Sequence, residues 1–200
     1  MTRIKICGLS RDADAEYVNE TKPDFAGFII GVPWSKRNID SAAALHLRKQ
    51  IDKSISTVGV FIDYPIEDIA KLVTDGAVDI VQLHGGEDAA YIERLRKLIP
   101  HTEIWKALVI KSGKDIIKAE QCSADRVLLD SGAGCGKTFD WGIVKEIKRE
   151  FILAGGLNPQ NIPVAIQQIK PWAVDLSSGV ETNGVKDREK IHAAVKAVRP

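Results

Sequence analysis

Cysteine and long apolar runs are both scarce in this sequence, and each scarcity excludes a class of protein. The three cysteines, Cys7, Cys122 and Cys135, are widely spaced and lack the CxxC spacing of zinc sites. An odd, scattered set argues against a disulfide framework, so a reducing cytoplasm is the simplest compartment. No apolar run reaches the roughly 18 residues of a transmembrane helix. The opening MTRIKICGLS also has no apolar signal-peptide core.

A charge excess of either sign is missing as well. The chain has 28 Lys and Arg against 27 Asp and Glu, a formal net charge of +1. We therefore expect no nucleic-acid partner and no membrane partner. The 200 residues are 44% hydrophobic and 28% charged, which is ordinary for a globular protein. With no linker or low-complexity segment, residues 1–200 are predicted to form one domain.

Short apolar runs recur along the chain, each followed by a turn and a longer segment of helical period. Most of the runs are continuous rather than alternating, which is typical of parallel strands buried on both faces. The predicted strands are Arg3–Cys7, Phe25–Ile30, Thr57–Phe61, Asp79–Leu83, Glu103–Leu108, Arg126–Asp130, Phe151–Ala154 and Ala173–Leu176. The predicted helices are Asp12–Glu20, Ser41–Gln50, Ile66–Asp75, Asp88–Leu98, Lys114–Gln121, Trp141–Lys148, Asn161–Ile169 and Arg188–Val198.

Eight strand-to-helix units predict a compact (β/α)8 TIM barrel, an α/β fold that usually takes about 250 residues. The alternative is an open doubly wound sheet, which more often has a phosphate loop after its first strand. Here the first strand ends in KICGLS and the glycine-rich segments come late. The barrel is therefore favoured, and its active site is expected at the carboxyl ends of the strands.

Two glycine-rich segments follow the last two predicted strands. LAGGLNP contains Gly155 and Gly156, and DLSSGVE contains Ser177, Ser178 and Gly179. Glycine lets backbone N–H groups approach an anion, and successive N–H groups form a concave anion nest. Each segment alone could be a tight turn, but both lie where barrels of this kind usually bind phosphate. We therefore expect a small phosphorylated substrate.

Two strand-end residues are candidates for acid–base chemistry. Cys7 ends the first strand, where a cysteine is more often a small core residue than a catalyst. Asp130 ends the sixth strand in RVLLDSG, where an aspartate could equally form a turn. Because the two strands are far apart around a ring of eight, their side chains could flank one ligand as acid and base.

Further polar residues lie near the ends of the second and fourth predicted strands or in the loops that follow them. Arg37 in the loop GVPWSKRNID could be a solvated charge, but its planar fork also suits a carboxylate. Gln82 and His84 lie in VQLHGGE. We place them with the substrate-binding residues; His84 could act as a base or be held by hydrogen bonds in its loop.

Taken in order, these motifs resemble the phosphoribosylanthranilate isomerase family. They are KICGL, GFI followed by SxR, VGVF, VQLHG, KTFDW, LAGGLNP and VDLSSGVE-x-x-G-x-KD, from about Lys5 to Ile191. The resemblance implies a (β/α)8 barrel that uses no cofactor or metal and performs an Amadori rearrangement in tryptophan biosynthesis. It implies a monomer or homodimer that acts in the cytoplasm.

The same resemblance implies residue roles. Cys7 would be the general base, Asp130 the general acid, and Arg37 the ligand of the anthranilate carboxylate, while Gly155, Gly156, Ser178 and Gly179 would line the phosphate site. The acid should have a raised pKa and the thiol base a lowered one.

Two loops depart from the family pattern. Ala133 and Cys135 stand in SGAGCGKTFDW where Gly and Thr are usual, and Lys36 replaces the proline before Arg37. Two other functions stay open. One is a related barrel isomerase with both tryptophan and histidine activity, which would call for paired aspartates on the first and fifth strands; Cys7 holds the first of these positions and speaks against it. The other is a barrel that senses a phosphometabolite without turning it over.

Overall fold

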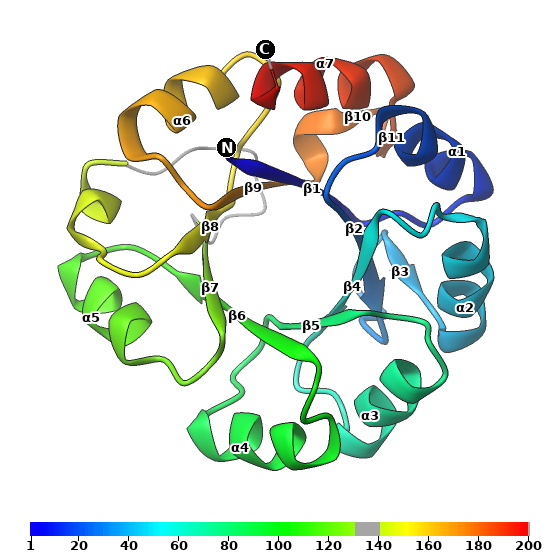
Figure 1. Ribbon diagram of the computed structural model, residues 1–200, viewed down its shortest axis with the longest axis horizontal. Helices are drawn as coiled ribbons and strands as arrows, with labels where there is room; N and C mark the ends of the chain where they lie inside the picture. The colour runs from blue at the N-terminus through cyan, green and yellow to red at the C-terminus, as the bar shows by residue number, and fades with distance from the viewer. Residues whose placement is uncertain (131–140, 200) are drawn as a thin grey trace.

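A closed ring of parallel strands forms the centre of the protein (Figure 1). The computed structural model describes residues 1–130 and 141–199. Each strand of the ring pairs with its two neighbours, and β1 closes the ring by pairing with both β9 and β2. The strands are β1 (Arg3–Cys7), β2 (Phe25–Ile30), β3 (Asn38–Ile39), β4 (Ser56–Phe61), β5 (Ile80–Leu83), β6 (Glu103–Val109), β7 (Arg126–Asp130), β8 (Phe151–Leu153) and β9 (Ala173–Leu176). The predicted (β/α)8 barrel is confirmed.

Helices surround the ring on its outer face (Figure 1). They are α1 (Asp12–Thr21), α2 (Ser41–Gln50), α3 (Ile66–Thr74), α4 (Ala89–Leu98), α5 (Gly113–Gln121), α6 (Ile162–Ile169) and α7 (Arg188–Val198). Side-chain caps fix several starts: Asp40 accepts a hydrogen bond from the Ala43 N–H, and Asp88 accepts one from the Tyr91 N–H. Among the described residues, no helix is long and apolar enough to cross a membrane.

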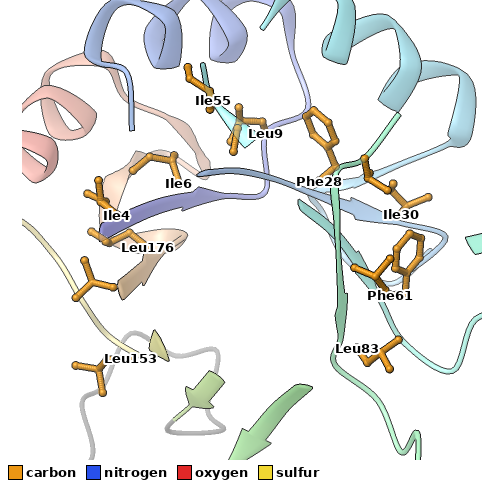
Figure 2. Packing of buried hydrophobic residues seen from close by; sticks show 14 of the residues in the cluster. Ile4, Ile6, Leu9, Phe28, Ile30, Ile55, Phe61, Leu83, Leu153 and Leu176 are labelled. Atoms are coloured by element: carbon orange, nitrogen blue, oxygen red, sulfur yellow. The ribbon is translucent and has the colours of Figure 1, made fainter. Parts of the chain in front are cut away.

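The barrel has two separate apolar layers because successive strand residues point to opposite faces. The outer layer fills the space between strands and helices, and Figure 2 shows part of it, including Ile4, Ile6 and Phe28. The inner layer fills the barrel itself and is built from a smaller set. Its buried members are Phe25, Val58, Ile80, Trp105, Ala107, Leu128, Ile152, Ala154 and Ala173.

Aromatic rings close the end of the barrel where the strands begin. Phe25 and Trp105 meet edge to face with ring centroids 5.1 Å apart, and Trp105 meets Trp172 at 6.0 Å. The guanidinium groups of Arg3 and Arg126 lie 4.5 and 3.7 Å from the Trp172 ring centroid. Aromatic side chains therefore fill the interior of the ring at this end.

Several short elements differ from the predictions. The predicted helix Trp141–Lys148 is wrong, because only a 3-10 turn, η1 (Ile143–Glu146), forms there. Gly142 weakens any helix at this point, because glycine is unfavourable inside a helix.

The segment between β9 and α7 contains short elements that the sequence did not predict. It contains a 3-10 turn, η2 (Ser178–Val180), and a hairpin of β10 (Glu181–Thr182) with β11 (Val185–Lys186). Asn183 and Gly184 form the hairpin turn with φ of 52° and 82°. Asn-Gly is a strong hairpin signal, and the sequence ETNGVK carried it. The two-residue β3 was also missed.

We expect Trp105→Ala to destabilise the protein by about 3–5 kcal/mol, because Trp105 is fully buried in the inner layer. Denaturant unfolding followed by circular dichroism measures the change. Leu98→Ala is the matched control: Leu98 is 52% exposed on α4, and its loss should matter by less than about 0.5 kcal/mol. Equal effects of the two substitutions would contradict the assignment of the inner layer.

Candidate active site

A pocket of about 140 Å³ opens at the carboxyl ends of the strands. All ten residues predicted to form the site line it: Cys7, Arg37, Gln82, His84, Asp130, Gly155, Gly156, Ser177, Ser178 and Gly179. They come from strand ends and loops all around the ring, which is why the sequence separates them widely. The structure thus gathers the whole predicted set at one rim.

Cys7 and Asp130 lie on different sides of this rim. Cys7 is the last residue of β1 and is almost fully buried, while Asp130 is the last residue of β7 and is partly exposed. On one way round the ring, only β9 and β8 lie between their strands. The loops that follow β8 and β9 are the two glycine-rich segments, so these loops sit between the thiol and the carboxyl group.

The two glycine-rich loops pack directly against each other. Gly155 and Gly156 have φ of 86° and 67°, which favours glycine at both positions. A Cβ on Gly179 would stand 1.8 Å from the carbonyl oxygen of Leu157, so only glycine fits there. The Asn161 amide donates to the Gly156 carbonyl at 2.9 Å. This packing holds backbone groups of both loops, and the hydroxyl groups of Ser177 and Ser178, around one end of the pocket.

Arg37 is held by Glu181, an acidic residue that was not among the predicted site residues. Glu181 on β10 accepts from Arg37 Nε at 2.5 Å and from Nη2 at 2.7 Å, and it accepts from Lys186 Nζ at 2.7 Å. Burial alone would raise the pKa of Glu181, but the hydrogen bonds from Arg37 and Lys186 outweigh it and lower the pKa to about 2. The Glu of SSGVE was part of a quoted motif, and nothing in its spacing indicated this pairing.

A second ion pair lies deeper in the barrel, below Cys7. Lys5 is fully buried and donates to Asp175 at 2.9 Å. Burial raises the pKa of the Cys7 thiol, and Lys5 offsets only part of that rise. The direction is opposite to the lowered pKa expected for a thiol base, because this end of β1 is withdrawn from water.

His84 faces Asp130 across the pocket. Its Nε2 lies 3.6 Å from Asp130 Oδ2, and its backbone N–H donates to the Phe61 carbonyl at 2.8 Å. The loop after it is held by Glu87, which accepts from the Gly85 N–H and from the buried Lys106. The backbone of His84 is thus fixed, and its ring lies in the pocket beside Asp130. The Gln82 side-chain oxygen is also buried, with no hydrogen-bond partner among the described residues.

Of the two loops that depart from the family pattern, the structure describes only the one that contains Lys36. Ala133 and Cys135 lie outside the described residues. Lys36 is 61% exposed, and its Nζ lies 3.7 Å from Glu181 Oε2, at the edge of the Arg37 pair. Among residues 1–130 and 141–199, no group of three or more His, Cys, Asp or Glu side chains is arranged to hold a metal ion.

A sequence profile described as N-(5'phosphoribosyl)anthranilate (PRA) isomerase matches residues 4–197. The chain belongs to this family. A relative from Endomicrobium trichonymphae, named N-(5'-phosphoribosyl)anthranilate isomerase, is 47% identical over all of this chain and 99% of its own length.

Two solved structures of phosphoribosylanthranilate isomerases have the same fold. One was solved with reduced 1-(o-carboxyphenylamino)-1-deoxyribulose 5-phosphate and superposes with a TM-score of 0.86 at 34% identity. The other, from monomers generated from the dimeric Thermotoga maritima enzyme, has a TM-score of 0.86 at 35% identity. Each match covers 100% of this chain and 99% of the other. The order of the sequence motifs and the fold of this isomerase family member therefore indicate the same family.

We expect Glu181→Gln to make the stability of the protein less dependent on acid. The pKa of Glu181 falls from an ordinary 4.5 to about 2 in the folded protein. Its ionised form therefore stabilises the fold above pH 4.5, and that contribution is lost as the pH falls toward 2. The free energy of unfolding, measured by urea titration, should differ most between wild type and variant near neutral pH.

At neutral pH the substitution should cost about 3–5 kcal/mol, because it leaves Lys186 buried beside a neutral amide. The difference should shrink between pH 4.5 and 2. Glu93→Gln is the control, since Glu93 and its partner Lys97 are both exposed on α4. A difference between wild type and Glu181→Gln that stays constant across this pH range would contradict the interpretation.

Proposed function

We propose that this chain catalyses the Amadori rearrangement of N-(5'-phosphoribosyl)anthranilate to 1-(2-carboxyphenylamino)-1-deoxyribulose 5-phosphate, a step of tryptophan biosynthesis. One observation carries the proposal: a thiol and a carboxyl group flank a pocket, and two interlocked glycine-rich loops lie between them. A phosphate anchored at those loops would place a short sugar chain between Cys7 and Asp130. Membership of the isomerase family supplies the substrate class.

The chemistry consists of proton transfers. Asp130, as general acid, gives a proton to the ring oxygen of the furanose, and the ring opens to a protonated imine. Cys7, as general base, removes the proton from the adjacent sugar carbon, which leaves an enolamine. Tautomerisation of the enolamine gives the ketone. The first two transfers use a donor and an acceptor on the protein, and the tautomerisation moves a proton from the C2 hydroxyl to C1 with no change of oxidation state, so the sequence of steps calls for no cofactor.

Arg37 would bind the anthranilate carboxylate. Glu181 occupies Nε and Nη2, whereas Nη1 makes no hydrogen bond to the described residues, so one end of the fork is available. The glycine loops and Ser178 would hold the phosphate at the other end of the pocket. The substrate would then lie across the rim with its two anions fixed at its ends.

His84 and Gln82 complete the substrate-binding set in this proposal. Both line the pocket between the Arg37 side and the Asp130 side. The enzyme would act as one domain in the cytoplasm, as a monomer or homodimer, given that the Thermotoga maritima relative is described as dimeric.

Removing either reacting group should abolish turnover and spare the fold. We expect Cys7→Ser and Asp130→Asn each to lower kcat by about 10²–10⁴-fold, the usual contribution of a positioned acid or base. Conversion is followed by the change in anthranilate fluorescence, and binding by titration with the reduced product analogue. A variant that keeps near-normal kcat would remove the corresponding residue from the mechanism.

Changing the shape of the carboxylate ligand should weaken binding more than turnover. Arg37→Lys keeps the charge but loses the planar fork, so KM should rise about 10–100-fold with a smaller change in kcat. Lys36→Ala, at the exposed neighbouring residue, should leave both constants within about twofold. A fall in kcat alone, with KM unchanged, would argue that Arg37 does not bind the ground-state carboxylate.

A further inference from the structure

A fully buried lysine lies inside the barrel directly below the proposed base. Lys5 and Cys7 are two residues apart on β1, so both side chains point into the ring. Neither residue belongs to the apolar inner layer. An ammonium group withdrawn from water costs several kcal/mol unless it is paired, so its presence here needs a reason.

One reason is the pair with Asp175. The register of β1 with β9 sets Lys5 opposite Asp175, and Lys5 Nζ lies 2.9 Å from Asp175 Oδ2. The other carboxylate oxygen, Oδ1, is buried with no hydrogen-bond partner among the described residues. The pair is thus incompletely satisfied among the described residues, and Asp175 also lines the pocket that Cys7 lines.

The other neighbour of Lys5 is the Cys7 sulfur. Gly27 on β2 pairs with Cys7, and a Cβ there would stand 2.9 Å from Cys7 Sγ and 3.0 Å from Lys5 Cε. Both side chains therefore lie over the same glycine. The end of the lysine chain is placed between a carboxylate on β9 and a thiol on its own strand.

The charges around Cys7 do not cancel. The cations that interact with it are Lys5, Lys186 and Arg37, from β1, β11 and the loop after β2. The carboxylates are Asp175 on β9 and Glu181 on β10, each paired with one or more of these cations. On β2, the residue paired with Cys7 is Gly27, which carries no charge. Lys5, Lys186 and Arg37 thus outnumber the two carboxylates beside the thiol. The exposed Lys36 adds a fourth cation next to Glu181, and Asp130 and His84 line the same pocket.

We infer that Lys5 is a positioning residue for the reaction: its ammonium stabilises the Cys7 thiolate, and Asp175 limits that stabilisation by holding the same ammonium. The inference rests on the proposed role of Cys7 as base and explains how a buried sulfur can take that role. The pKa directions agree with it. Burial raises the pKa of Cys7, Lys5 opposes that rise, and Asp175 adds to it.

The two neighbours should therefore shift Cys7 in opposite directions. Lys5→Met removes the cation, so the pKa of the Cys7 thiol should rise by about one unit or more. Asp175→Asn removes the competing carboxylate and keeps the cation, so the pKa should fall by a similar amount. A loss of packing or stability would not produce shifts of opposite sign.

The experiment measures the rate of iodoacetamide alkylation against pH in the full-length, ligand-free enzyme. Mass spectrometry of the Cys7 peptide separates its alkylation from that of Cys122 and Cys135. Lys106→Met is the matched control, because Lys106 is another buried, paired lysine but contacts Glu87 on the outer side of the ring. It should leave the Cys7 pKa unchanged.

Lys5→Met could fold poorly because it leaves Asp175 unpaired. The double variant Lys5→Met/Asp175→Asn removes both charges and provides a neutral pair. Its Cys7 pKa should lie above that of Asp175→Asn, because only the single variant keeps the cation. Equal values in these two variants, or shifts of the same sign in the two single variants, would overturn the inference.

The proposed function is tested separately by turnover. An enzyme that shows the opposite shifts but has no isomerase activity would contradict the function and leave the electrostatic arrangement standing. An active enzyme in which Lys5→Met leaves the Cys7 pKa unchanged would support the function and contradict the electrostatic arrangement. In the active case, the acidic limb of the kcat/KM profile should move with the measured thiol pKa in each variant.

Discussion

Closure of the strand ring is the constraint on which the rest of this structure depends. β1 pairs with β9 on one side and β2 on the other, so residues 170 positions apart become neighbours. A closed parallel ring has no free edge, and all its strands end at one rim. The polar groups that the pocket uses lie at the ends of these strands or on the loops that follow them. The fold itself therefore concentrates the chemistry.

The two ends of the ring have opposite characters for a physical reason. At the start of the strands, Trp105 and Trp172 fill the interior with aromatic surface. At the other end, Lys5 and Glu181 lie in pairs with partners from neighbouring strands and loops. Buried charges persist only when paired and hydrogen-bonded, so each one fixes the position of another side chain. The charges at the rim therefore hold one another in place through ion pairs.

Much of the fold and the site could be predicted from sequence. Continuous apolar runs marked the strands, and the rule that active sites lie at their carboxyl ends selected ten residues that all line one pocket. The predictions failed where the pattern was weak. The expected helix at Trp141–Lys148 is only a short turn, and the hairpin around Asn183 was overlooked although its turn residues are characteristic.

The sequence by itself determined the eight strands of the ring and their order, because burial on both faces requires apolar runs that are visible one residue after another. It also placed the ends of six of these strands, whereas β6 ends one residue later and β8 one residue earlier than predicted. Only the tertiary structure decided which side chains pair: Arg37 with Glu181, and Lys5 with Asp175. Those pairings arise from strand register and loop packing across the ring, and no local spacing encodes a contact between residues so far apart in the chain.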